Sequence, residues 1–119
     1  MSGEARICFD RAHFYQVLGN LLGNGLRHSR KESASLRLVV SDSERTGWID
    51  LHVVDDGPGV DEATREQIFE PFFTTHSRGT GLGLYIAREL CEANAAQLEL
   101  RESASGADFC ISGRYDECH

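Results

Sequence analysis

The sequence Gly-Thr-Gly-Leu-Gly-Leu at residues 79–84 leads directly into a predicted helix that runs from about residue 82 to residue 94. The apolar residues of this helix recur at helical spacing and form one stripe, which consists of Leu84, Ile86, Ala87 and Leu90. Glycine permits close backbone approach, and free amides at the start of a helix attract phosphate oxygens. The pattern is not a P-loop, because no lysine follows in the required place, and no strand precedes it as a dinucleotide fingerprint requires. Taken alone, it favours a helix-entry turn and a phosphate site about equally.

Further helices and strands are predicted on both sides of this stretch. Asp10 is expected to cap a long helix whose apolar residues recur every three or four positions until it fades near His28. Strands are predicted at residues 35–41, 48–54, 97–101 and 108–112, and a short acidic helix at residues 62–69. Together these elements predict a two-layer α/β sandwich, in which helices cover one face of a mixed, mostly antiparallel sheet.

The run Asp-Asp-Gly-Pro-Gly at residues 55–59 follows the second predicted strand and cannot continue it. Asp-Gly and Pro-Gly pairs readily form plain turns, and for this run alone a turn is the better interpretation. The functional interpretation is that a buried carboxylate, Asp55, ends the strand and accepts a hydrogen bond from the amino group of a base. The glycines would then let the chain pass close to the ring.

The first helix contains two asparagines, Asn20 and Asn24, which lie one turn apart on the same face. Asparagine is a poor interior helix residue, and the neighbouring Gly23 and Gly25 each cost about 0.8–1 kcal/mol relative to alanine. Either the asparagines are solvated and the glycines permit tight packing, or two amide oxygens face Mg²⁺ and the phosphates it accompanies, since Mg²⁺ prefers oxygen ligands. In the second case Arg27 or His28, one turn further on, could reach the same anions.

Taken together, these features resemble the ATP-binding catalytic domain of sensor histidine kinases, and the resemblance spans about residues 7–113. Residues 20–29 are similar to the N box of that family, residues 55–59 to its G1 box, residues 69–73 to its F box and residues 79–84 to its G2 box. Within the family, the short loop and the helix after the G2 box look most like the nitrogen-regulation and type IV pilus sensor kinases. Four motifs in the right order are far more specific than any one of them.

The resemblance implies the Bergerat ATP-binding fold, with ATP and Mg²⁺ as ligands. Asp55 would bind the adenine amino group, in a pocket shaped by two glycines, and Asn24 would coordinate Mg²⁺ with Asn20 as its companion. Residues 72–78 would form a short ATP lid, and the phenylalanines at residues 69, 72 and 73 would anchor its base or act structurally only. The implied nucleotide-binding residues are Asn20, Asn24, Arg27, His28, Asp55, Gly57, Gly59, Thr80, Gly81, Leu82 and Gly83.

One position separates a kinase from an ATPase. Relatives of this fold in gyrase, the Hsp90 chaperones and MutL have a glutamate four residues before the metal-binding asparagine, where it activates water. Asn20 occupies that position here, which favours a kinase. None of the five histidines lies in the sequence context of a phosphoacceptor, so the γ-phosphate would go to a histidine on a separate dimerisation domain and then to a response regulator. An anti-sigma-type serine kinase and a degenerate nucleotide-sensing or docking module are the alternatives.

Composition restricts the partners of the chain. With 119 residues it has the length of one domain, and its net charge of −7 argues against binding to nucleic acid or to a membrane surface. The N-terminal residues lack the apolar core of a signal peptide, so we expect a cytoplasmic domain of a protein that could itself be membrane-anchored. The four cysteines are scattered, and free thiols are expected. The dimer interface of the family usually lies in the dimerisation helices, so we expect a monomer.

Overall fold

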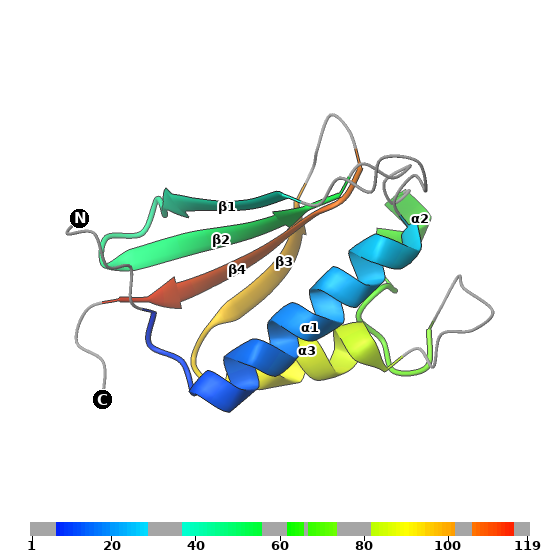
Figure 1. The fold of residues 1–119 in the computed structure, drawn as a ribbon, viewed down its shortest axis with the longest axis horizontal. Coiled ribbons are helices and arrows are strands. Elements are labelled where there is room, and N and C mark those ends of the chain that lie inside the picture. The colour runs from blue at the N-terminus through cyan, green and yellow to red at the C-terminus, as the bar shows by residue number, and fades with distance from the viewer. Residues whose placement is uncertain are drawn as a thin grey trace.

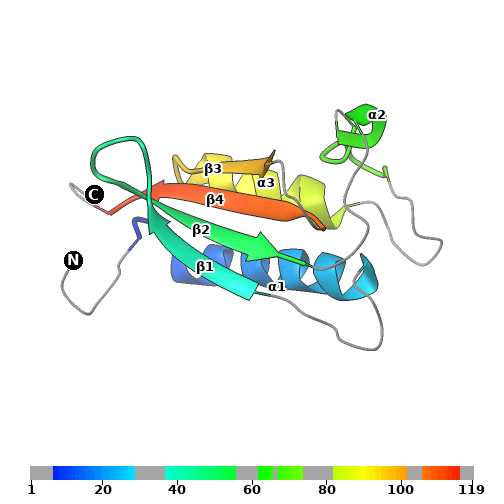
Figure 2. The same ribbon diagram turned by 90° about the horizontal axis from the view of Figure 1, so that it is seen from above.

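The computed structural model describes residues 7–28, 37–55, 62–65, 67–73, 82–101 and 106–115, with only the backbone described for residues 24–28. The elements follow the chain as α1 (Arg11–His28), β1 (Arg37–Asp42), β2 (Trp48–Val54), α2 (Glu62–Arg65), α3 (Gly83–Ala93), β3 (Gln97–Arg101) and β4 (Asp108–Arg114). The four strands form one sheet in the order β1-β2-β4-β3, and α1 and α3 cover one face of it (Figure 1). Figure 2 shows that α1 lies below the β1–β2 side and α3 below the β3–β4 side.

The core lies between the sheet and the two long helices. Alternate residues of each strand point toward the helices, and cross-strand partners such as Val53 and Phe109 therefore meet on this face. Val17 and Leu21 of α1 and Ala87 of α3 are fully buried against them, as the helical spacing of apolar residues predicted. This burial is what orients the two helices relative to the sheet.

The beginning of α1 is joined to the end of α3. The carboxylate of Asp10 accepts a hydrogen bond from the backbone amide of His13 at 3.0 Å, which confirms the predicted helix cap. This hydrogen bond is also the main reason that the pKa of Asp10 is lowered. The backbone amide of Asp10 donates to the side-chain oxygen of Asn94 at 2.8 Å, and the Asn94 amide donates to the Leu90 carbonyl at 2.7 Å. The two helices are thereby aligned at the end of the molecule where α1 begins.

The described strands agree with the predicted sheet, and one expectation about a helix is corrected. All three described strand pairings are antiparallel, as expected for a mostly antiparallel sheet. The helix predicted at residues 62–69 ends at Arg65, whose guanidinium donates to the Leu100 carbonyl at 2.9 Å. After it the chain continues in turns that bring Phe69 against Phe109, with 6.1 Å between the ring centroids. A continued helix is therefore replaced by turns that bury an aromatic ring.

The cysteines are also not all free thiols. Cys91 and Cys110 are free and buried, as expected, but Cys8 is disulfide-bonded. The backbone amide of Cys8 donates to the carbonyl of Arg114 at 2.6 Å, so the segment before α1 lies beside the end of β4. This proximity of two segments far apart in the sequence is not visible in the spacing of the cysteines.

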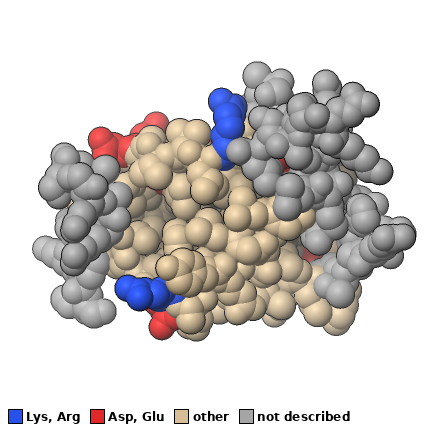
Figure 3. Space-filling model, viewed as in Figure 1, with Lys and Arg blue, Asp and Glu red and all other residues tan. Residues whose placement is uncertain are grey.

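Among the described residues, no helix is both long and apolar enough to cross a membrane. On the face shown in Figure 3, the charged side chains that are described lie at the margins, and uncharged residues form the middle.

Candidate functional site

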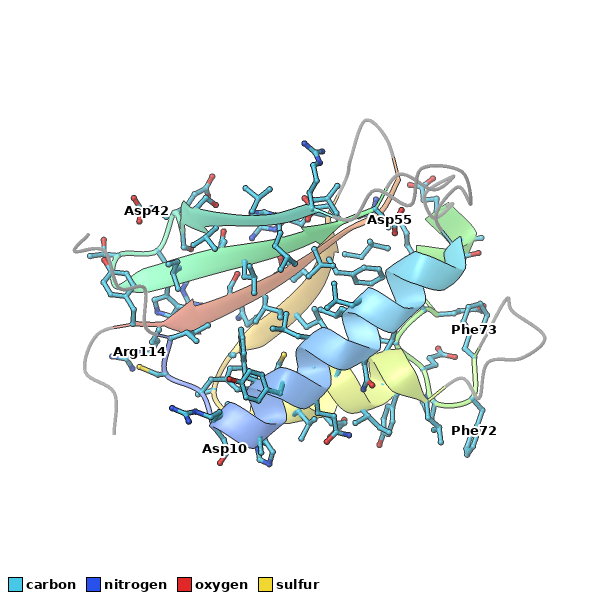
Figure 4. The ribbon with its side chains drawn as sticks, in the orientation of Figure 1. Asp10, Asp42, Asp55, Phe72, Phe73 and Arg114 are labelled. Carbon is cyan, nitrogen blue, oxygen red and sulfur yellow. The ribbon has the colours of Figure 1, made fainter. Side chains whose placement is uncertain are left out.

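The described parts of all four sequence motifs lie at one end of the molecule. The second half of α1 lies there, α3 begins there, and β2 ends there at Asp55 (Figure 1). Figure 4 places Asp55, Phe72 and Phe73 at this end, opposite Asp10 and Arg114 along the long axis. The convergence follows from the topology, because α1 and α3 run in opposite directions under the same sheet.

Asn20 of α1 contacts the first residue of α3. Its side-chain amide donates a hydrogen bond to the backbone carbonyl of Gly83 at 3.1 Å, across 63 positions of sequence, and the bond is partly buried. The predicted N box and G2 box are therefore in contact. Because the amide nitrogen of Asn20 is engaged with Gly83, the amide oxygen is the atom that this side chain can offer to a cation.

Asp55 is buried, with 5% of its surface exposed, at the end of β2. One of its carboxylate oxygens, Oδ1, accepts a hydrogen bond from the Ala107 backbone amide at 3.1 Å. The Asp55 backbone amide donates in turn to the Ala107 carbonyl at 3.0 Å. The sequence motif alone favoured a plain turn, but Asp55 is a buried carboxylate at a strand end, as the functional interpretation requires.

The residue at the N-cap of α3 does not cap the helix with its side chain. Leu82 occupies the cap position and makes no side-chain cap hydrogen bond, and its carbonyl accepts the first helical bond from Ile86 at 2.8 Å. A side chain added at Gly83 would have no atom within 4 Å, so packing does not explain the glycine. The backbone amides at the start of a helix are groups that can donate hydrogen bonds to an anion.

The phenylalanines of the predicted F box have different environments. Phe69 packs edge-on against Phe109 in the core, and the Arg88 guanidinium lies 5.2 Å from the centre of the Phe69 ring. Phe72 is 74% exposed and has a positive φ of 67°, a conformation that is uncommon for a bulky residue. Phe69 is therefore packed into the core, whereas Phe72 lies on the surface.

The remaining predicted site residues are only partly described. Asn24, Arg27 and His28 lie in the last turns of α1, so their backbone is at the expected end of the molecule. The structure does not describe their side chains. Four further predicted residues lie wholly outside the described residues: Gly57, Gly59, Thr80 and Gly81.

Sequence reasoning missed Gly106 and Ala107, which belong to none of the four motifs. Both contact Asp55 in the structure. A glycine just before a strand is a weak local signal for such a contact, and nothing in the sequence pairs it with an aspartate about fifty positions earlier.

A second polar cluster lies on the face of the sheet that the helices do not cover. Asp50, His52 and Cys110 have potential ligand atoms within 4.8 Å of one another, the only such group among the described residues. Asp50 already accepts a hydrogen bond from Ser112 at 2.7 Å and lies 3.6 Å from the Arg101 guanidinium. Burial raises the pKa of the Cys110 thiol to about 11, which keeps it protonated. We interpret this cluster as an internally satisfied hydrogen-bond network rather than a metal centre.

Comparison with known proteins agrees with this architecture. Residues 9–115 match the family model of histidine kinase-, DNA gyrase B- and HSP90-like ATPases. The sensor protein kinase PilS of Pseudomonas aeruginosa is 42% identical over 107 residues, which cover 88% of this chain and 20% of that protein. The solved catalytic domain of histidine kinase ThkA is 30% identical with a TM-score of 0.80, covering 93% of this chain and 73% of that one. Full-length ShkA in complex with AMPPNP is 29% identical with a TM-score of 0.76, covering 94% of this chain and 23% of that one.

The chain therefore belongs to the family of histidine kinase-, DNA gyrase B- and HSP90-like ATPases, as an ATP-binding domain of the histidine kinase type. The fold class predicted from the sequence and the resemblance to sensor histidine kinases are both confirmed. The chain spans about one fifth of the length of PilS.

Proposed function

We propose that this domain binds ATP together with Mg²⁺ and donates the γ-phosphate to a histidine on a separate dimerisation domain, for relay to a response regulator. The observation that carries the proposal is the meeting of a buried carboxylate, an asparagine-bearing helix and the N-terminus of a second helix at one end of the fold. A carboxylate for a base amino group and amides for phosphates are the groups that a purine nucleotide needs.

The base would bind at the end of β2. Asp55 would accept the hydrogen bond of the adenine 6-amino group, and Gly57 and Gly59 would allow the chain to pass close to the ring. The burial of Asp55 supports this role, because a hydrogen bond to a charged acceptor is stronger away from water.

The metal and the phosphates would bind between α1 and α3. Asn24 would coordinate Mg²⁺ with Asn20 as its companion, and the engaged amide nitrogen of Asn20 supports a ligand role for its oxygen. When bound, Mg²⁺ neutralises phosphate charge and holds the phosphates in position. Arg27 and His28 would add positive charge, and the backbone amides of residues 80–83, which comprise Thr80, Gly81, Leu82 and Gly83, would donate hydrogen bonds to phosphate oxygens.

Asn20 is also the reason to propose a kinase instead of an ATPase. An amide does not accept a proton as a carboxylate does, so Asn20 cannot serve as the general base that activates water. ATP would therefore persist until a protein nucleophile arrives, and catalysis would come mainly from positioning and charge neutralisation. The domain would turn over little ATP alone.

The expected partners follow from the same reaction. They are the phosphoacceptor domain and, indirectly, a response regulator, with neither nucleic acid nor a direct membrane contact for this domain. We propose a monomeric domain on the cytoplasmic side, in a protein that is itself either free or membrane-anchored. Nucleotide binding is further supported by the similarity to ShkA, which was solved in complex with AMPPNP.

The proposal is tested first by calorimetric titration with AMPPNP, with and without Mg²⁺. The native domain should bind, Asp55→Asn should lose most of the affinity, and Asn24→Ala should lose only the part that depends on Mg²⁺. Absence of binding by a folded native domain would instead favour a degenerate docking module.

The second step is phosphotransfer from radiolabelled ATP to a separately supplied histidine-bearing dimerisation domain. Phosphohistidine is labile to acid and stable to alkali, so the label should disappear in acid. An acid-stable label would indicate a serine kinase, and steady release of phosphate without protein labelling would indicate an ATPase.

A further inference from the structure

We infer that the backbone of Gly106 and Ala107 fixes the orientation of the Asp55 carboxylate and thereby makes the site selective for adenine over 6-oxo purines. The inference rests on the proposed binding of ATP, and it adds a positioning unit on the β3–β4 connection that the sequence motifs do not include.

Asp55 and Ala107 extend the pairing of β2 and β4 by one residue pair. The last pair of the ladder is Val54 with Asp108, and beyond it Asp55 and Ala107 exchange two hydrogen bonds. In one, the Asp55 amide donates to the Ala107 carbonyl at 3.0 Å, and in the other the Ala107 amide donates to the side-chain Oδ1 at 3.1 Å. The second bond makes the side chain of Asp55 part of the backbone ladder.

Gly106, the residue before Ala107, lies directly against Asp55. It has a φ of +74°, and a Cβ there would overlap the backbone carbonyl oxygen of Asp55 and lie 2.7 Å from Oδ1. Any other residue would be strained in that conformation and would also have to displace the carboxylate. Glycine is therefore the residue that lets the connection lie directly on Asp55.

The direction of the Ala107 hydrogen bond has a chemical consequence. A backbone amide only donates, so the atom at the Oδ1 position must be an acceptor. Oδ2 is then the oxygen that we assign to the adenine 6-amino group, and a carboxylate oxygen can accept more than one hydrogen bond. In Asp55→Asn, the amide oxygen has to occupy the Oδ1 position, and the NH₂ group faces the base. An NH₂ group repels a 6-amino group but donates well to a 6-oxo group.

The test compares ADP with IDP, which differ at position 6 of the base, by calorimetry in excess Mg²⁺. The native domain should bind ADP at least about tenfold more tightly than IDP, because the buried carboxylate has no donor for a 6-oxo group. Asp55→Asn should bind ADP weakly and reverse the preference in favour of IDP. If Asp55→Asn instead keeps the preference for ADP, its amide is not oriented by Ala107 and the inference is wrong.

Gly106→Ala tests the positioning role directly. It should weaken ADP binding by about tenfold or more and reduce the ratio of IDP to ADP dissociation constants, since the carboxylate is displaced. The matched control is Gly113→Ala near the other end of β4, where a Cβ would approach Ile7 at 2.5 Å, far from Asp55. This control should lower the thermal stability and leave the nucleotide ratio unchanged.

The outcomes separate the two proposals. A native domain that does not bind ADP contradicts the proposed function itself. A native domain that binds ADP, together with a folded Gly106→Ala variant whose ratio equals that of Gly113→Ala, contradicts only the positioning role. If Gly106→Ala does not fold, the preference of Asp55→Asn for IDP or ADP tests whether Ala107 orients the side chain at position 55.

Discussion

The hydrogen bond between Asn20 and Gly83 can be removed without changing the shape of the side chain. In Asn20→Asp, an oxygen replaces the amide nitrogen that donates to the Gly83 carbonyl at 3.1 Å. The two residues have similar helix propensities, so the intrinsic helix preference of α1 is nearly unchanged. The variant loses one partly buried hydrogen bond and places a carboxylate against a carbonyl oxygen. A loss of about 1–3 kcal/mol in the free energy of unfolding is expected.

The assay is thermal and urea unfolding followed by circular dichroism. For a domain of this size, a loss of 1–3 kcal/mol lowers Tm by about 4–12 °C. The pKa of the new carboxyl group should be raised in the folded state, because its charged form faces a carbonyl oxygen. A raised pKa means that the folded state retains the proton longer, so the loss of stability should be largest at neutral pH. It should shrink as the pH falls through that pKa and the protonated group donates to Gly83 again.

The matched control is Gln16→Glu, which makes the same chemical change on an exposed residue one turn earlier in α1. A surface change of this kind should alter the stability by no more than about 0.5 kcal/mol. If Asn20→Asp is as stable as Gln16→Glu at neutral pH, the contact between Asn20 and Gly83 does not hold α1 against α3.

Three further predictions concern the core, the helix cap and the thiols. Leu21→Ala, at a fully buried position, should cost about 2–5 kcal/mol in urea unfolding, and a cost below about 1 kcal/mol would contradict its place in the core. Because the His13 backbone amide lowers the pKa of Asp10 below 3.8, this cap should stabilise the fold at higher pH and lose its contribution as the pH falls below that value. In Asp10→Asn, the loss of stability at acid pH should be smaller by the contribution of this cap. Identical acid unfolding curves for the native domain and Asp10→Asn would contradict this prediction. Burial raises the pKa of Cys91 to about 12 and that of Cys110 to about 11, so both should resist a thiol reagent at pH 8 until the protein is unfolded, as peptide mapping can establish.

Local patterns predicted the helices and strands in which apolar residues recur at a regular spacing. The two long helices and the four strands occur where apolar spacing and turn residues placed them, because burial of one face dictates that spacing. The short helix was predicted to be too long. It ends at Arg65, and a helix of four residues is too short for apolar periodicity to indicate where it ends. The antiparallel pairing of β2 with β4 follows from long-range packing, which no local pattern contains.

The candidate site was predicted in its residue types but not in its contacts. Asp55 and Asn20 were recognisable because their motifs resemble those of a known family. Their partners, Ala107 and Gly83, lie 52 and 63 positions away in the sequence, and only the folded chain brings them together. Spacing can indicate a nucleotide site, but it cannot show which backbone groups orient its side chains.

The side chains of Asn20 and Asp55 share one physical feature. Each is hydrogen-bonded to a backbone atom of another part of the chain. Asn20 is bonded to a carbonyl of α3, and Asp55 to an amide next to β4. The position of a backbone atom is set by helix packing and by strand register, and not by the rotamer of an exposed residue. The geometry of the site is therefore determined by the core, in particular by the burial of Leu21 beneath the sheet and by the pairing of Val54 with Asp108. A core substitution that shifts α1 relative to the sheet should thus weaken nucleotide binding even when the domain remains folded, because it moves the groups that orient the ligands.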